Sequence, residues 1–371
     1  MKRRRLSSFG FLVTVMTVGC GGGGKGATTG SGGVQGTGGS AGGSVGSGGS
    51  VSSGGSGGSG GSTGSGGGAG GTCPTDGFAS APTAWSLPSF GSCAFDQGTS
   101  GIVQNGSLSY STLDINGDGK PDLVVSYVAS NCSPTVPAAQ WLVYLNDGTG
   151  FSSTATPWSL PSFGSSCAFN QGTSGIVQNG SLSYSTLDMN GDSKPDLVVS
   201  YVASNCSPTV PAAQWLVYLN NGTGFSSTAT PWSLPSFGSS CAFNQGASGI
   251  VQNGSLSYAT LDITGDGKPD LVVSHAATNC SPAVPAAQWL VYPNAGTGFA
   301  STAIPWSLPS FGSSCAFDQG TSGIVQNGSL SYATLDITGG GKLDLVVSHA
   351  ASNCSATVPA AQWLVYPSAC Q

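Results

Sequence analysis

The sequence lacks glutamate and carries little charge of either sign. Only 6% of its 371 residues are charged, and all fifteen acidic residues are Asp. Arginine is confined to positions 3 to 5, and there are two histidines, His275 and His349. Nucleic-acid binding depends on Lys and Arg that displace counterions from phosphates, so nucleic acid is excluded as a partner. Acid–base catalysis needs paired carboxylates or a histidine-centred triad, so the composition also disfavours an enzyme.

The positive charge that is present gathers at the N-terminus. Lys2 to Arg5 precede an apolar stretch from about Phe9 to Val18, with small residues before Cys20. This pattern predicts a signal peptide over residues 1–19, too short to span a bilayer as a mature helix. Thr17-Val18-Gly19-Cys20 resembles a bacterial lipobox, which predicts a lipid on Cys20 and an outer-membrane or cell-surface lipoprotein. An ordinary secretory signal and a released protein is the alternative.

Residues 20–72 lack almost everything except Gly, Ser and Thr. Such a segment cannot bury enough apolar area to offset the entropy lost on ordering, so it is interpreted as a flexible linker. About 50 residues of this composition have a root-mean-square reach of about 40 Å. The membrane is therefore predicted to be reached only through the lipid anchor.

What remains is an internal repeat. Ala-Ala-Gln-Trp-Leu-Val-Tyr recurs every 74 residues and places tryptophans at 141, 215, 289 and 363. Within one copy, residues 107–115, 122–130, 138–146 and 150–160 read as strands, and no stretch has a helical period. Four such units predict an all-β fold over residues 73–371, with four 74-residue, four-stranded repeats in a β-propeller-like ring.

The ends of the repeat region predict how this ring closes. The last copy stops after Trp363 to Tyr366 and lacks its fourth strand. Residues 77–85 match residues 150–158, including the spacing from Phe to Trp, so an N-terminal strand is expected to complete the last blade and cover two open edges. Strand exchange between two chains into a larger ring fits the same pattern.

The eleven cysteines suit an oxidising compartment. Beyond Cys20, eight occur as one pair per copy, and bridges within a copy or across copies both fit the spacing. These pairs are Cys93 and Cys132, Cys167 and Cys206, Cys241 and Cys280, and Cys315 and Cys354. The remaining two, Cys73 and Cys370, are predicted to staple the ring at its seam. Because no Cys-x-x-Cys occurs, metal ligation by cysteine is disfavoured.

Each copy contains one acidic loop, which in the first copy spans residues 114–122. Oxygen-bearing side chains at loop positions 1, 3 and 5, a Gly at 6 and a backbone carbonyl at 7 form the pattern by which a short peptide wraps calcium. In an EF-hand the loop would continue to a Glu at position 12. Here Asp122, at position 9, closes the site and a strand follows.

Two motifs in the first copy resemble the FG-GAP/VCBS repeat of integrin-α-like β-propellers. They are Asp-x-Asn-Gly-Asp-Gly-x-x-Asp-Leu-Val-Val and, after it, Trp-Leu-Val-Tyr-Leu-Asn-Asp-Gly-Thr-Gly-Phe. The resemblance covers about 300 residues and implies calcium bound by the loop between two strands of a blade. The lysines enter the predicted ligand set through their carbonyls. The predicted ligands are Asp114, Asn116, Asp118, Lys120 and Asp122; Asp188, Asn190, Asp192, Lys194 and Asp196; and Asp262, Thr264, Asp266, Lys268 and Asp270.

The four loops depart from this pattern to different degrees. The second has Ser193 where Gly is expected, and a left-handed conformation costs a non-Gly residue about 1 kcal/mol. In the third, Thr264 replaces the amide. The fourth has Gly340 in place of the central Asp, so three calcium ions are expected. The alternative is that the Asp and Asn residues only form turns and the loops bind no metal.

Other candidate residues lie outside the acidic loops. His275 and His349 are interpreted as strand side chains, and the tryptophans as packing residues rather than sugar platforms. The long loops between blades, such as residues 89–106, are predicted to lie on the face opposite the acidic loops. A ligand there would meet Phe95, Gln97, Asn105 and their repeats.

These features predict a cell-surface, calcium-stabilised propeller that acts as a binding, adhesion or display module for a surface protein or glycan. A lectin-like carbohydrate binder is the alternative. A secreted hydrolase is disfavoured because the Asp residues are engaged as expected ligands and leave no acid–base pair.

Overall fold

The computed structural model describes residues 81–99, 103–137, 139–172, 177–248, 251–321 and 324–368. All of these residues belong to one compact unit. The predicted signal peptide, the linker, Cys20, Cys73 and Cys370 lie outside the described residues. These predictions therefore stay predictions.

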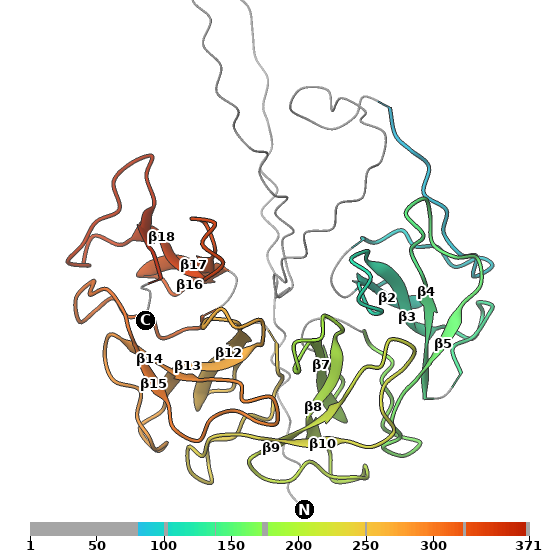
Figure 1. Cartoon of the computed structure of the whole chain (residues 1–371), viewed down its shortest axis with the longest axis horizontal. Helices are drawn as coiled ribbons and strands as arrows, with labels where there is room; N and C mark the ends of the chain where they lie inside the picture. Colours follow the sequence, from blue (N-terminus) through green and yellow to red (C-terminus); the bar gives the residue numbers. More distant parts are fainter. Residues whose placement is uncertain are drawn as a thin grey trace, which may run out of the picture. The chain divides into compact units, whose positions relative to one another are not determined.

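The described chain folds into four antiparallel sheets that follow one another in sequence order (Figure 1). The first contains β1 (Val103–Gln104), β2 (Leu108–Leu113), β3 (Asp122–Val128), β4 (Gln140–Tyr144) and β5 (Thr156–Ser159). The second contains β6 (Val177–Gln178), β7 (Leu182–Leu187), β8 (Asp196–Val202), β9 (Gln214–Tyr218) and β10 (Thr230–Ser233). The third contains β11 (Val251–Gln252), β12 (Leu256–Leu261), β13 (Asp270–Ala276), β14 (Gln288–Tyr292) and β15 (Ile304–Ser307). The fourth contains β16 (Ile324–Gln326), β17 (Leu330–Leu335), β18 (Asp344–Ala350) and β19 (Leu364–Tyr366).

This arrangement confirms the predicted four-bladed β-propeller with a 74-residue repeat. The four strands predicted for each copy correspond to β2 to β5 in the first blade. A short inner strand, β1, was not predicted; it pairs Val103 with Tyr110 and Gln104 with Ser109. The first three sheets therefore have five strands, and the fourth, which has no counterpart of β5, has four.

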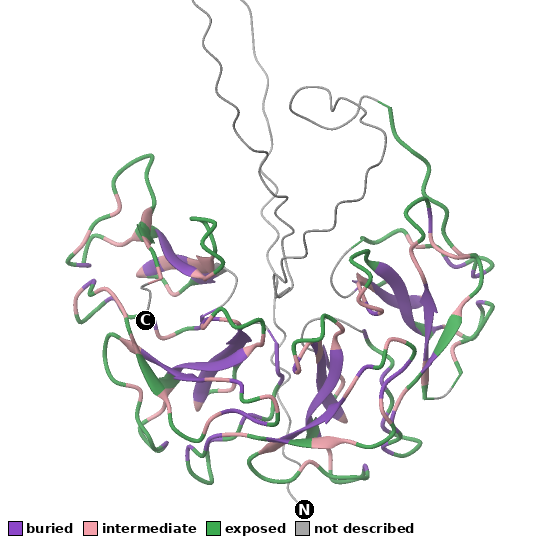
Figure 2. Ribbon diagram, in the orientation of Figure 1, coloured by how far each residue is buried: buried purple, intermediate pink, exposed green. Residues whose placement is uncertain are grey.

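The core lies between consecutive sheets, where each blade presents a tryptophan to the next. Trp141 and Trp215 are fully buried, and each donates from Nε1 to a carbonyl of the following blade, Phe169 O and Phe243 O, at 2.7 Å. Their rings also meet a phenylalanine of that blade edge to face. The buried residues follow the sheets and the exposed ones follow the loops (Figure 2). The interpretation of the tryptophans as packing residues is confirmed for these positions.

The propeller ends expose the side chains that other blades bury. Trp363, which directly precedes β19, is 61% exposed and Trp85 is 42% exposed, whereas their counterparts Trp215 and Trp232 are 0% and 1% exposed. Ser86 bridges Gly150 of the first blade as Ser233 bridges Gly298. The described N-terminal segment thus lies beside the first blade at Ser86. Among the described strands, β19 pairs only with β18. Residues 77–80 lie outside the described residues, so the expected pairing of residues 77–85 with β19 stays a prediction.

Four disulfides each close within one copy, between Cys93 and Cys132 and the three equivalent pairs. This resolves the choice left open by the sequence in favour of bridges within a repeat. Disulfides persist in oxidising compartments, so they indicate an exported protein. The described part of the chain contains no helix long and apolar enough to cross a membrane.

Candidate functional site

The first acidic loop, between β2 and β3, winds around the carboxylate of Asp114. Asp114 Oδ1 accepts hydrogen bonds from the N–H groups of Gly117 and Asp118 at 2.9 and 3.0 Å, and Oδ2 accepts one from Gly119 at 2.7 Å. Asn116 Oδ1 accepts the Asp118 N–H at 2.9 Å. Gly119 has a φ of 85°, which allows the sharp turn. The residues at positions 1, 3, 5 and 6 are thus held in one compact loop.

Asp122 closes this loop from the first residue of β3 and is fully buried. Its Oδ1 accepts the Asn146 N–H at 2.8 Å, but its Oδ2 has no hydrogen-bond partner. Burial, together with repulsion from the carboxylates of Asp118 and Asp114, raises the Asp122 pKa to about 6. A buried carboxylate oxygen without a donor, beside two further carboxylates, is the environment that a bound cation would stabilise.

The second and third loops repeat this geometry. Asp188 and Asp262 each accept the N–H groups of loop positions 4, 5 and 6. Burial raises the pKa of Asp196 to about 7 and also raises that of Asp270. Asp196 Oδ2, the atom equivalent to Asp122 Oδ2, accepts the Met189 N–H at 3.0 Å. In the first loop the Ile115 N–H lies close enough to the Asp122 carboxylate to lower its pKa, although Oδ2 accepts no hydrogen bond.

The fourth loop keeps its turn without the central carboxylate. Asp336 still accepts the N–H groups of Gly340 and Gly341, both at 2.8 Å. Although burial acts to raise the Asp344 pKa, hydrogen bonds from Ser368 and Thr338 outweigh it and the pKa is lowered. The closing carboxylate is therefore satisfied by the protein in this loop, as it also is in the second and third loops.

The lysines of the first three loops point back to the central Asp of their own loop. The Nζ–Oδ2 distances are 3.3 Å for Lys120–Asp118, 3.4 Å for Lys194–Asp192 and 3.7 Å for Lys268–Asp266. All six side chains are substantially exposed, so these ion pairs add little stability. A cation that takes the Asp oxygens would release the lysine side chains into solvent.

The three carboxylates of each expected ligand set are not gathered into a metal site in this structure. No group of three or more His, Cys, Asp or Glu side chains that could hold a metal is found among the described residues. The expected set adds an amide or hydroxyl oxygen and one backbone carbonyl per loop, which are ligands that calcium accepts. Together with the unpartnered Asp122 Oδ2, this composition fits calcium.

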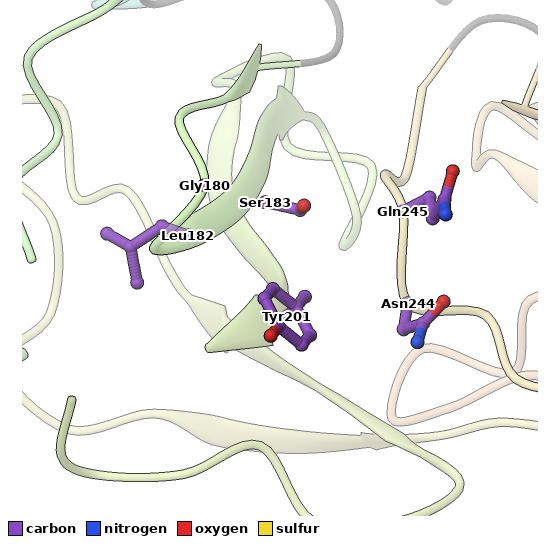
Figure 3. Close-up of a pocket in the computed structure, with 6 residues that line it drawn as sticks. All are labelled: Gly180, Leu182, Ser183, Tyr201, Asn244 and Gln245. Carbon is purple, nitrogen blue, oxygen red and sulfur yellow. The ribbon is translucent and has the colours of Figure 1, made fainter. Parts of the chain in front are cut away.

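A second surface lies between the second and third blades, among the loops predicted to face away from the acidic ones. A pocket of about 340 Å³ is lined by Gly180, Leu182, Ser183, Tyr201, Asn244 and Gln245. Figure 3 shows the two amide side chains facing Ser183 and Tyr201 across the gap. Gln245 is the repeat of Gln97, so one of the three residue types expected at a ligand surface does line a pocket.

The other two types make contacts within the fold, and their expected ligand role stays a prediction. The repeats of Phe95 at positions 169, 243 and 317 are buried to 4 or 5% exposure, and Phe95 itself packs edge to face on Tyr110. Asn105 donates to Ala94 O and accepts the N–H of Leu108, which fixes the turn before β2. The strand assignment of His275 and His349 is confirmed, since they lie in β13 and β18.

The acidic loops also carry the resemblance to known proteins. Residues 114–199 and 188–273 match the model of the FG-GAP-like repeat family. Each matched segment begins at the first Asp of an acidic loop. The match therefore includes the ligands predicted from the sequence and the strands that follow them. No curated protein matches the chain.

Three solved structures are similar in fold. One is an Agrocybe aegerita lectin described as recognising non-reducing terminal N-acetylglucosamine, with 17% identity and a TM-score of 0.36 over 66% of this chain and 47% of that one. The others are a Photorhabdus luminescens Tc holotoxin pore (15% identity, TM-score 0.33, covering 66% of this chain and 11% of that chain) and a TcdB2-TccC3 structure (15% identity, TM-score 0.28, covering 72% and 13%). The chain spans about half of the lectin's length.

Proposed function

We propose that this chain is an exported FG-GAP-like propeller whose first three acidic loops bind calcium and stiffen a binding or display module at the cell surface. The observation that carries the proposal is the buried Asp122 Oδ2, which lacks a partner beside two other carboxylates. Bound calcium would supply positive charge to the buried carboxylates. Asp114, Asn116, Asp118, Asp122 and the Lys120 carbonyl would hold it in the first loop, with the equivalent residues in the next two.

Calcium titration of the full chain tests this proposal. We expect an upward shift in melting temperature at millimolar calcium, because a ligand that binds only the folded state stabilises it. Isothermal titration calorimetry should give three ions per chain. The fourth loop provides matched variants: Asp118→Gly copies Gly340 and should leave two ions, whereas Gly340→Asp should add a fourth. No melting shift at millimolar calcium in the wild-type chain would overturn the proposal.

Anchoring through Cys20 is a separate part of the proposal. The lipobox-like Thr17-Val18-Gly19-Cys20 supports it, and the Gly/Ser linker would then separate the propeller from the membrane. Cys20→Ser should move the chain from the membrane fraction to the soluble fraction of expressing cells. Equal fractionation of Cys20→Ser and the wild type would exclude the lipid anchor.

Carbohydrate binding is the second candidate for the module's ligand. The pocket of Ser183, Tyr201, Asn244 and Gln245 combines an exposed aromatic ring with amide and hydroxyl groups, which can stack on and hydrogen-bond to a neutral sugar. A glycan array should then show binding that Tyr201→Ala and Gln245→Ala abolish. Binding that neither substitution changes would exclude this pocket. A hydrolase panel on the same protein checks the proposal that the chain is not an enzyme.

A further inference from the structure

Two asparagine side chains connect consecutive blades at the acidic loops. Asn220, which follows β9, donates from Nδ2 to the Ile115 carbonyl of the first loop at 2.8 Å. Asn294, which follows β14, donates in the same way to the Met189 carbonyl of the second loop at 2.9 Å. Both asparagines are buried, with 3% and 5% exposure. The two bonds join residues that are 105 positions apart in the chain.

The same two asparagines also hold the closing carboxylate of their own blade. The Asn220 N–H donates to Asp196 Oδ1 at 2.8 Å, and the Asn294 N–H donates to Asp270 Oδ1 at 2.9 Å. Ile115 lies between Asp114 and Asn116, two proposed ligands of the first loop. Asn220 therefore makes two contacts: its N–H bonds to Asp196, a proposed ligand of the second site, and its side chain bonds to the backbone between two proposed ligands of the first site.

The acidic loops themselves are packed tightly where they meet. A Cβ added at Gly117 of the first loop would lie 2.9 Å from Lys194 Cγ and 3.1 Å from Ser193 O of the second. A Cβ added at Gly191 would likewise lie close to Lys268 Cγ of the next loop, and one added at Gly265 would lie close to Lys342 Cγ. These contacts place consecutive acidic loops against one another.

The chain also contains this asparagine without its bond to another blade. In the first blade, Asn146 donates from Nδ2 to Pro121 O of its own blade at 2.9 Å, and its N–H holds Asp122. In the fourth blade the position is Ser368, whose N–H holds Asp344 but whose buried Oγ has no hydrogen-bond partner. The contact between blades is thus separable from the contact within a blade.

We infer that Asn220 and Asn294 are positioning residues that couple neighbouring calcium sites, the first to the second and the second to the third. This inference rests on the proposed calcium binding. An ion held by Asp196 fixes the Asn220 backbone, and the Asn220 amide then orients the Ile115 carbonyl between two ligands of the first loop. Thermodynamic linkage requires the effect to be reciprocal, so each filled site raises the affinity of its neighbour.

The test is calcium titration calorimetry on the full chain and on two serine variants that copy Ser368. Asn220→Ser removes the bond to the preceding blade together with side-chain bonds within its own blade. Asn146→Ser, the matched control, removes only the equivalent bonds within a blade. We expect cooperative binding in the wild type and in Asn146→Ser. We expect Asn220→Ser to bind three ions with the cooperativity between the first two sites lost and the affinity reduced about fivefold, the lower end of typical coupling.

A double-mutant cycle separates coupling from general weakening of the fold. Asp118→Gly, which disables the first site, should lower the affinity of the second site in the wild-type background but leave it unchanged in the Asn220→Ser background. Equal effects in both backgrounds would overturn the inference, as would three independent sites in the wild type. A wild-type chain that binds no calcium would overturn the proposed function as well, which distinguishes the two failures.

Discussion

Ser193 holds in the second acidic loop the left-handed conformation that Gly119 holds in the first, with φ angles of 67° and 85°. The loop pattern predicted a left-handed conformation at this position, because the turn around Asp188 requires it whether the residue is Gly or Ser. A serine pays a steric cost in this region that glycine avoids.

Ser193→Gly should therefore raise the free energy of unfolding by about 1 kcal/mol. The reverse change, Gly119→Ser, should lower it by a similar amount, and nothing lies within 4 Å of a Cβ added at Gly119, so backbone strain is the cause being tested. Denaturant unfolding without calcium measures both changes. A destabilising Ser193→Gly would show that the serine side chain makes a contact more valuable than the relief of strain.

The tryptophan that recurs in each copy is expected to contribute different amounts to the free energy of unfolding at different positions. Trp215→Ala should cost about 3–5 kcal/mol, because it empties a fully buried site and leaves the Phe243 carbonyl without its donor. Trp363→Ala, at the 61% exposed counterpart, should cost about 1 kcal/mol or less. Denaturant unfolding of both variants checks the difference. A cost at Trp363 equal to that at Trp215 would show that residues 77–85 cover β19 in solution.

Each disulfide is expected to stabilise its blade. Replacing Cys241 and Cys280 together by Ala opens a bridge with a sequence separation of 39, for which the chain-entropy model gives about 4 kcal/mol. Thermal and denaturant melts of this double variant against the wild type measure the loss. If the double variant melts with the wild type, the bridge does not constrain the unfolded chain in the expected way.

Two tyrosines between blades should make the fold sensitive to alkali. Burial raises the pKa of Tyr218 and of Tyr292 to about 12, against about 10 for an exposed tyrosine. The folded state thus favours the neutral phenol, so this contribution to stability is complete below pH 10 and is lost as the pH rises from 10 through 12. Melting curves between pH 9 and 12 should show the decline. The double variant Tyr218→Phe, Tyr292→Phe should be less sensitive, and unchanged sensitivity would locate the cause elsewhere.

The sequence predicted most of the fold because the fold is local and repeated. Alternating apolar residues placed the four main strands of each blade, and the tryptophan period gave the number of blades. The strand Val103–Gln104 was not predicted because two residues are too few to show the alternation of apolar and polar side chains that marks a strand. The packing of the Phe95 ring on Tyr110 could not be predicted, because the two residues lie in different segments and no local pattern connects them.

In the candidate site, too, local features could be predicted from the sequence and contacts between blades could not. The acidic loops follow from the order of residues over nine positions, so their turns could be predicted. The bond from Asn220 to Ile115 depends on how two blades face each other, and no pattern within a single repeat contains that information. The same limit applies to the pocket of Tyr201 and Gln245, whose two walls come from different blades.

The contact from tryptophan to the next blade has a consequence for how this chain can change over generations. Trp141 and Trp215 use the same bond and the same aromatic neighbour on successive blades. A gene segment encoding one 74-residue copy, duplicated in frame, would therefore encode a blade that finds a ready-made neighbour on either side. Unequal recombination between such similar copies could lengthen or shorten the protein without a new interface having to evolve.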